Sequence, residues 1–169
     1  MPLYFAYGSN MDVEAMARRC PRAKPLGSAR LARHRLEIMR EGWLTAARDP
    51  RSEVHGVLWD VALADMRALD RYEGLADGLY AKAIQPVIGE RGAKQALIYF
   101  GANCGPGVAA ADYIAGVLAA ARHWRLPAAT IARLESFAAA AGAARSAAPA
   151  NADPGLRVRP RFATPFDRD

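Results

Sequence analysis

Residues 4–10 read Tyr-Phe-Ala-Tyr-Gly-Ser-Asn, and the change of residue type within this stretch decides the fold that we predict. The apolar, aromatic run of residues 3–7 favours a strand that is buried on both faces. Gly8 follows directly, and because it has no Cβ atom it allows a sharp turn or a ligand close to the backbone. We therefore expect the chain to begin with a buried strand that ends in a turn.

A short helix is expected after this turn, over residues 11–19. Ser9 and Asn10 are both favourable N-cap residues, and Asp12 lies three positions after Ser9, close to the spacing of a capping box. The first N–H groups of a helix have no acceptor within it, so a helix start suits an anion or a developing oxyanion. An ordinary capped turn explains the same residues, since Gly-Ser-Asn turns are common.

The composition is that of a soluble globular domain. The 169 residues are 52% hydrophobic and 24% charged, with a net charge of +6. No apolar run reaches the ~18 residues of a membrane span, and we see no signal peptide, so we expect a cytoplasmic protein that does not bind membranes. Cys20 and Cys104 give neither a disulfide framework nor a metal-binding spacing. The arginines within 30–35 and 157–168 are not interleaved with aromatic residues, which argues against a nucleic-acid partner.

Hydrophobic periodicity and turn residues divide the rest of the chain. We predict strands over 54–61, 79–88 and 94–100, helices over 62–72, 110–126 and 128–141, and a strand in the second half of 27–40. Residues 41–53 are expected to form a loop with a short extended piece at 44–46. Gly56, inside the first of these strands, indicates a bulge or close backbone packing. Residues 1–142 are expected to form one domain, and the Pro- and Arg-rich residues 143–169 an extended or disordered tail.

Glu73 is the candidate acid–base residue because of its place at a helix end. The helix over 62–72 is followed by Glu73 and Gly74, and glycine is favoured just beyond a helix C-terminus. The negative end of the helix dipole disfavours an ionised carboxylate, so we expect the pKa of Glu73 to be raised. A carboxyl group with such a pKa is a better general acid and base. A solvated surface glutamate is the alternative interpretation.

Several of these stretches carry a family resemblance. The string at 4–10 resembles the N-terminal signature of the gamma-glutamylcyclotransferase family. The stretch 53–59, Glu-Val-His-Gly-Val-Leu-Trp, is similar to a strand of that family, and 69–74, Leu-Asp-Arg-Tyr-Glu-Gly, resembles the segment that carries its catalytic glutamate. Gly-Leu-Tyr at 78–80 and a tyrosine early in a helix, Tyr113, extend the resemblance over about residues 3 to 137.

The resemblance implies an α+β fold, a gamma-glutamyl cyclotransferase-like small mixed β-barrel flanked by helices. It implies that a γ-glutamyl amino acid is cyclised to 5-oxoproline with release of the amino acid, without metal or cofactor, and that Glu73 is the catalytic acid and base. The substrate-binding residues that it implies are Tyr4, Phe5, Ala6, Tyr7, Gly8, Ser9, Asn10 and Tyr113.

Two other functions remain open from the residues. A γ-glutamylamine cyclotransferase would act on γ-glutamyl amines, because the leaving group is selected by pocket walls that the sequence does not define. A non-catalytic module of the same fold would bind a small molecule without turnover, although the presence of Glu73 argues against it. The expected partner is in each case a small molecule, and a homodimer is left open.

Overall fold

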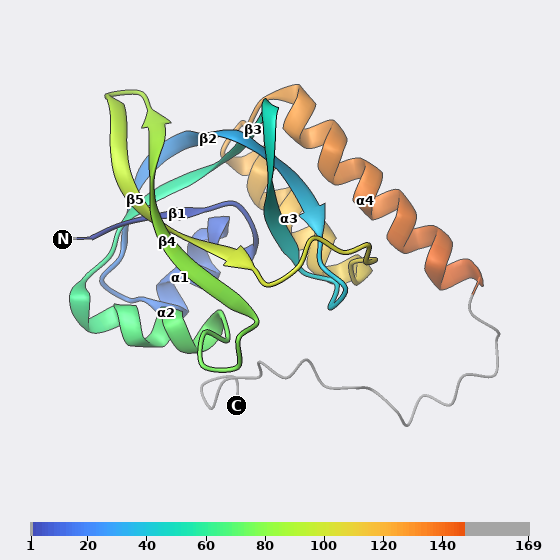
Figure 1. Ribbon diagram of the computed structural model, residues 1–169, viewed down its shortest axis with the longest axis horizontal. Helices are drawn as coiled ribbons and strands as arrows, with labels where there is room; N and C mark the ends of the chain where they lie inside the picture. Colours follow the sequence, from blue (N-terminus) through green and yellow to red (C-terminus); the bar gives the residue numbers. More distant parts are fainter. Residues whose placement is uncertain (1, 148–169) are drawn as a thin grey trace.

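The computed structural model describes residues 2–147 and contains a closed barrel with the strand order β1-β3-β2-β4-β5, flanked by helices (Figure 1). The elements are β1 (Leu3–Ala6), η1 (Ser9–Met11), α1 (Val13–Arg19), β2 (Lys24–Ile38), β3 (Leu44–Asp60), η2 (Leu63–Asp65), α2 (Met66–Tyr72), β4 (Tyr80–Gly89), β5 (Gly92–Gly101), α3 (Ala111–His123) and α4 (Ala128–Ala147). The α+β class and the small mixed barrel predicted from the sequence are confirmed.

The N-terminal strand β1 closes the barrel. It pairs antiparallel with β3 and parallel with β5, and this one parallel pairing makes the sheet mixed. Gly56 on β3 lies so close to β1 that a Cβ atom there would be 2.1 Å from the carbonyl oxygen of Ala6. The close backbone packing predicted at Gly56 is therefore confirmed, and it brings the aromatic run into the core.

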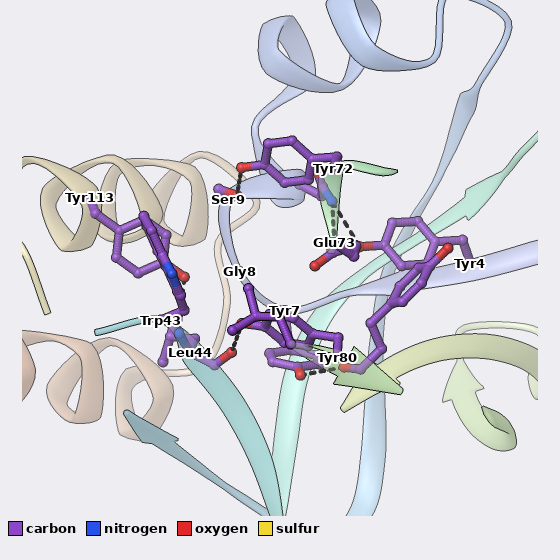
Figure 2. A pocket seen from close by; sticks show the side chains of 13 residues that line it. Tyr4, Tyr7, Gly8, Ser9, Trp43, Leu44, Tyr72, Glu73, Tyr80 and Tyr113 are labelled. Carbon is purple, nitrogen blue, oxygen red and sulfur yellow. Dashed lines mark hydrogen bonds between the residues drawn. The ribbon is translucent and has the colours of Figure 1, made fainter. Parts of the chain in front are cut away.

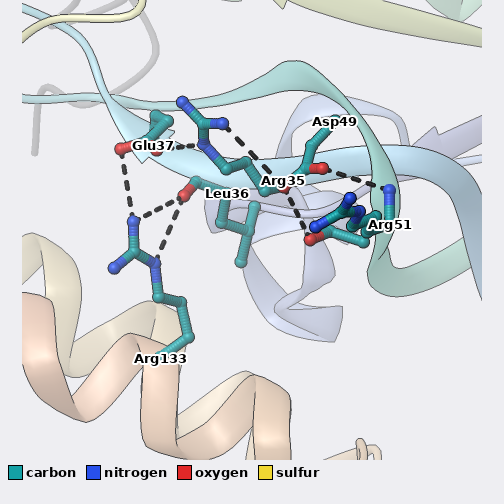
Figure 3. Close-up of polar contacts among 7 residues, drawn as sticks. Arg35, Leu36, Glu37, Asp49, Arg51 and Arg133 are labelled. Carbon is teal, nitrogen blue, oxygen red and sulfur yellow. Dashed lines mark hydrogen bonds and ion pairs between the residues drawn. The ribbon is translucent and has the colours of Figure 1, made fainter.

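The prediction of a loop over residues 41–53 holds for 41–43 and for the extended piece at 44–46, but it was wrong for 47–53. Strand β3 starts at Leu44 and pairs with β2 along almost its whole length, from Ile38↔Leu44 to Lys24↔Asp60. Residues 49–52 lie opposite a single residue of β2, Arg33, and form a bulge inside the long strand. The turn predicted from residues 49–52 does form, but only within this bulge, where the Arg51 N–H donates to the Asp49 carboxylate at 3.1 Å (Figure 3).

Two C-terminal helices pack beside each other along one side of the barrel (Figure 1). Helix α4 is fastened to β2 by Arg133, whose guanidinium donates to the Leu36 carbonyl oxygen at 3.2 Å and to the Glu37 carboxylate at 3.3 Å (Figure 3). Helix α4 continues to Ala147, so the predicted helix end at 141 was six residues too early, and residues 143–147 of the predicted tail are helical. The rest of that predicted tail, 148–169, lies outside the described residues.

Candidate functional site

A cavity of about 570 Å³, including the open solvent at its mouth, lies at one end of the barrel (Figure 2). Six parts of the chain contribute to it: the β1–η1 connection, the β2–β3 hairpin, the end of α2, strand β4, strand β5 and helix α3. Its lining residues are Tyr4, Tyr7, Gly8, Ser9, Asn10, Trp43, Leu44, Tyr72, Glu73, Leu79, Tyr80, Tyr99 and Tyr113.

The turn after β1 differs in detail from the prediction. Residues 9–11 form one 3₁₀ turn, and helix α1 begins only at Val13. Its N-cap is Asp12, whose carboxylate accepts from the Ala15 N–H at 2.6 Å. The predicted capping by Ser9 and Asn10 was therefore wrong. Because Asp12 caps the helix, these two side chains are available to the cavity.

Glu73 points into this cavity from the end of α2, where Gly74 ends the helix with a φ of 61° (Figure 2). The Asn10 amide donates to Glu73 Oε1 at 2.8 Å, and the Tyr4 hydroxyl donates to the same oxygen at 3.3 Å. The Asn10 amide nitrogen also donates to the Tyr4 hydroxyl at 3.0 Å. Three side chains thus form a closed triangle, and both of these bonds to the carboxylate end on Oε1.

Burial raises the pKa of Glu73 to about 7. The hydrogen bond from Tyr4, the charge of Arg19 and the hydrogen bond from Asn10 act in the opposite direction, since each stabilises the carboxylate. The direction of the shift agrees with the sequence prediction, but its main cause is desolvation rather than the helix dipole. At neutral pH the protonated and ionised forms are both populated, as acid–base chemistry requires.

Tyr113 lies on the opposite wall from Glu73 (Figure 2). Its hydroxyl accepts from the Leu44 N–H at 3.2 Å, and its ring meets Trp43 edge-on with the centroids 4.9 Å apart. A Cβ atom on Gly8 would be 3.4 Å from the Tyr113 hydroxyl, so the glycine allows the tyrosine to approach the turn closely. Helix α3 therefore contributes Tyr113 to the lining of the cavity.

Two of the predicted binding residues do not line the cavity. Phe5 is fully buried in the barrel core, and Ala6 is 1% exposed and packs against the backbone at Gly56. Both belong to β1 and support the turn from below. Their expected contact with a substrate is not what the structure shows, because only Tyr4 and the residues after the strand face the cavity.

Four aromatic residues of the lining were not identified from the sequence as site residues, namely Trp43, Tyr72, Tyr80 and Tyr99, whereas Tyr7 was. Tyr80 donates to the Leu44 carbonyl oxygen at 2.7 Å, and Tyr7 donates to that of Tyr99 at 2.5 Å. Burial raises the pKa values of these tyrosines, so their phenols stay neutral hydrogen-bonding groups at any working pH. The other side chains that line the cavity with Glu73 are thus uncharged.

Glu73→Gln is expected to stabilise the fold at pH 8 and not at pH 4. The folded-state pKa of about 7 lies above the ordinary value of 4.5, so burial of the ionised group costs stability. This cost is absent below pH 4.5, grows between pH 4.5 and 7, and is complete above pH 7. Glutamine has an uncharged amide oxygen that can still accept the hydrogen bond from Asn10, so Glu73→Gln removes this cost. Thermal unfolding at the two pH values measures the difference, and exposed Glu90→Gln is the control. An equal change of Tm at both pH values would show that the carboxyl group is not desolvated.

Within residues 2–147, no cluster of three or more His, Cys, Asp or Glu side chains is arranged to hold a metal ion. None of the helices in the same range is both long and apolar enough to cross a membrane.

Comparison with known proteins gives a consistent family. The family model for gamma-glutamyl cyclotransferase, AIG2-like, matches residues 4–126. The gamma-glutamylcyclotransferase of Bos taurus is 35% identical and that of Homo sapiens 34% identical over an alignment of 88 residues, and the match covers 46% of this chain and 47% of each relative. The alignment thus spans about half the length of these relatives. A solved structure of a gamma-glutamyl cyclotransferase superimposes with a TM-score of 0.74 at 26% identity, over 80% of this chain and 86% of the other. The chain therefore belongs to the gamma-glutamyl cyclotransferase, AIG2-like family.

Proposed function

We propose that this protein is a gamma-glutamylcyclotransferase, which cyclises the γ-glutamyl group of a γ-glutamyl amino acid to 5-oxoproline and releases the amino acid. The observation that carries the proposal is the position of Glu73, a carboxyl group with a pKa of about 7, in the same cavity as the turn at 8–10. The names of the relatives support the same activity.

The reaction closes a five-membered ring within one substrate molecule. The α-amino nitrogen attacks the γ-carbonyl carbon, the C–N bond of the ring forms, and the bond to the leaving nitrogen breaks. A cavity that holds the substrate folded on itself supplies much of the rate, because the two reacting atoms are already close. The amine loses a proton and the leaving nitrogen gains one, and Glu73 is placed to accept the first and donate the second.

The tetrahedral intermediate carries a negative oxygen that requires hydrogen-bond donors. In the 3₁₀ turn, the Met11 N–H donates to the Gly8 carbonyl oxygen and the Asp12 N–H donates to the Ser9 carbonyl oxygen. The N–H groups at the start of such a turn have no acceptor within it. We assign the N–H groups of Gly8 and Ser9 to the oxyanion, and the lack of a Gly8 side chain gives the substrate access to them.

One observation favours a second candidate, cyclisation of γ-glutamyl amines. Among the described residues, the cavity lining contains no Lys, Arg or His, and it includes a wall of largely apolar side chains, among them Trp43, Leu79 and Tyr113. A leaving amino acid carries a carboxylate, which such a wall would not pair, whereas a leaving amine presents only apolar and amine groups. The two candidate reactions share the same chemistry and differ only in the leaving group that this wall would accept.

A matched pair of substrates tests the proposal and separates the candidates. γ-Glutamyl-alanine and γ-glutamyl-ethylamine differ only in the carboxylate of the leaving group. Formation of 5-oxoproline from γ-glutamyl-alanine with the higher kcat/KM supports the first candidate, and a preference of 10-fold or more for the amine supports the second. Conversion of neither compound would exclude both and favour a non-catalytic binding module.

A further inference from the structure

We infer that Arg19 is a positioning residue for Glu73, because it holds the Asn10 amide in the one orientation that donates to the Glu73 carboxylate. This assignment rests on the proposed role of Glu73 as acid and base. Arg19 is the last residue of α1, and its Nη1 donates to Asn10 Oδ1 at 2.7 Å. Arg19 is not among the lining residues of the cavity, so it acts from behind the residues that a substrate touches.

The orientation of the Asn10 amide follows from what each neighbour can accept. A guanidinium group can only donate, so the amide oxygen must face Arg19. The amide nitrogen then faces Glu73 and Tyr4, and its two protons serve the two bonds at 2.8 and 3.0 Å. The opposite orientation would place the amide oxygen against an ionised carboxylate, where two acceptors repel. Asn10 is 2% exposed, so water cannot replace the lost bond.

Arg19 makes a second contact that points to the same role. Its guanidinium lies 3.7 Å from the centroid of the Tyr72 ring, and the Tyr72 hydroxyl lies 2.8 Å from Ser9 Oγ. Tyr72 directly precedes Glu73 at the end of α2. One side chain therefore joins α1, the 3₁₀ turn and the helix end that carries the carboxylate, which are the parts that must keep their relative positions during the reaction.

Arg19 is also the cation that faces Glu73. The other titratable groups that interact with this carboxylate are the phenols of five tyrosines. They are Tyr4 on β1, Tyr7 just after it, Tyr80 on β4, Tyr99 on β5 and Tyr113 on α3. The charge of Arg19 lowers the pKa of Glu73 against the larger effect of burial. Loss of Arg19 should therefore affect both the geometry of the carboxylate and its ionisation.

Three variants of the full chain test this assignment. Arg19→Met removes the donor and the charge, and Arg19→Lys keeps both but loses the planar fork. Arg18→Met removes the same charge from the neighbouring, exposed position of α1 and is the matched control. The Glu73 carboxyl group is titrated by ¹³C NMR, with its resonance assigned by its absence in Glu73→Gln. The same proteins are assayed for kcat and for the pH profile of kcat/KM on γ-glutamyl-alanine.

Arg19→Met is expected to raise the pH at which Glu73 titrates by about 1, and to move the ascending limb of kcat/KM equally. Its kcat should fall about 10- to 100-fold, because a displaced base loses its alignment with the amine. Arg19→Lys should restore the titration and most of kcat, and Arg18→Met should match the wild type. An unchanged Glu73 titration in both Arg19 variants would overturn the assignment, even if kcat fell. If Arg19→Met did not fold, wild-type titration in Arg19→Lys together with a normal kcat would support the role of the donor, and a displaced titration there would contradict it.

The titration separates failure of this inference from failure of the proposed function, because it requires no turnover. A wild type that makes no 5-oxoproline would refute the function, whereas the coupling between Arg19 and Glu73 would still be decided by the NMR measurement.

Discussion

Glu73→Gln is expected to lower kcat for 5-oxoproline formation by about 10²- to 10⁴-fold, the usual contribution of one positioned acid–base group. Glutamine has nearly the same size and can still accept from Asn10 and Tyr4, but it cannot take the proton of the attacking amine. The dissociation constant of the substrate should change much less, since the turn at 8–10 and the aromatic walls remain intact. Steady-state rates and equilibrium binding measure the two effects separately.

The control for this prediction is Glu90→Gln, the same change of charge at an exposed position in the β4–β5 turn. It should have wild-type kcat. Ser9→Pro should behave differently from both, because it removes the Ser9 N–H and weakens binding together with turnover. Near-normal turnover by Glu73→Gln would mean that another residue is the base, and the assignment of Glu73 would be withdrawn.

Gly56→Ala is expected to produce the largest loss of stability among conservative substitutions in the barrel. The new Cβ atom would lie 2.1 Å from the Ala6 carbonyl oxygen and 3.0 Å from the Phe5 ring, so β1 would have to move. Such overpacking costs about 1–3 kcal/mol or more, which for a domain of this size corresponds to a fall in Tm of roughly 2–12 °C. Activity should also fall, because β1 carries Tyr4 and leads into the turn at 8–10.

Gly116→Ala provides the matched control. Gly116 is exposed on α3, and a Cβ atom there would meet no atom within 4 Å. Alanine is the better helix former by about 1 kcal/mol, so Tm should rise slightly. Thermal unfolding of the two variants therefore gives changes of opposite sign. A Gly56→Ala protein as stable as the wild type would show that β1 and β3 are not packed as closely as described.

The parts of the site that are contiguous in sequence could be predicted. The turn after the aromatic strand and the glutamate before Gly74 each follow from a local rule, namely the end of a strand or of a helix. Their meeting in one cavity could be inferred only from the resemblance, because 63 residues separate Asn10 from Glu73. Local rules carry no information about which strand closes the barrel.

The residues that were missed depend on long-range packing. Trp43 and Leu44 reach the cavity because β2 and β3 form one long hairpin, whereas the turn residues at 49–52 indicated a loop. The pairing of β2 with β3 outweighed the preference of residues 49–52 for a loop, and these residues form a bulge within β3. Arg19 was not identified as a site residue, since nothing nearby in the sequence shows that it contacts Asn10.

The central claim is that Glu73 and the turn at 8–10 catalyse a cyclisation within one substrate. The most direct measurement is the product balance after incubation with γ-glutamyl-alanine, with 5-oxoproline, alanine and free glutamate quantified over time by mass spectrometry. We expect 5-oxoproline and alanine in a 1:1 ratio, without glutamate, and formation of both to depend on Glu73. Glutamate and alanine in equal amounts would instead indicate hydrolysis by water and would contradict the claim, as would a turnover that Glu73→Gln leaves unchanged.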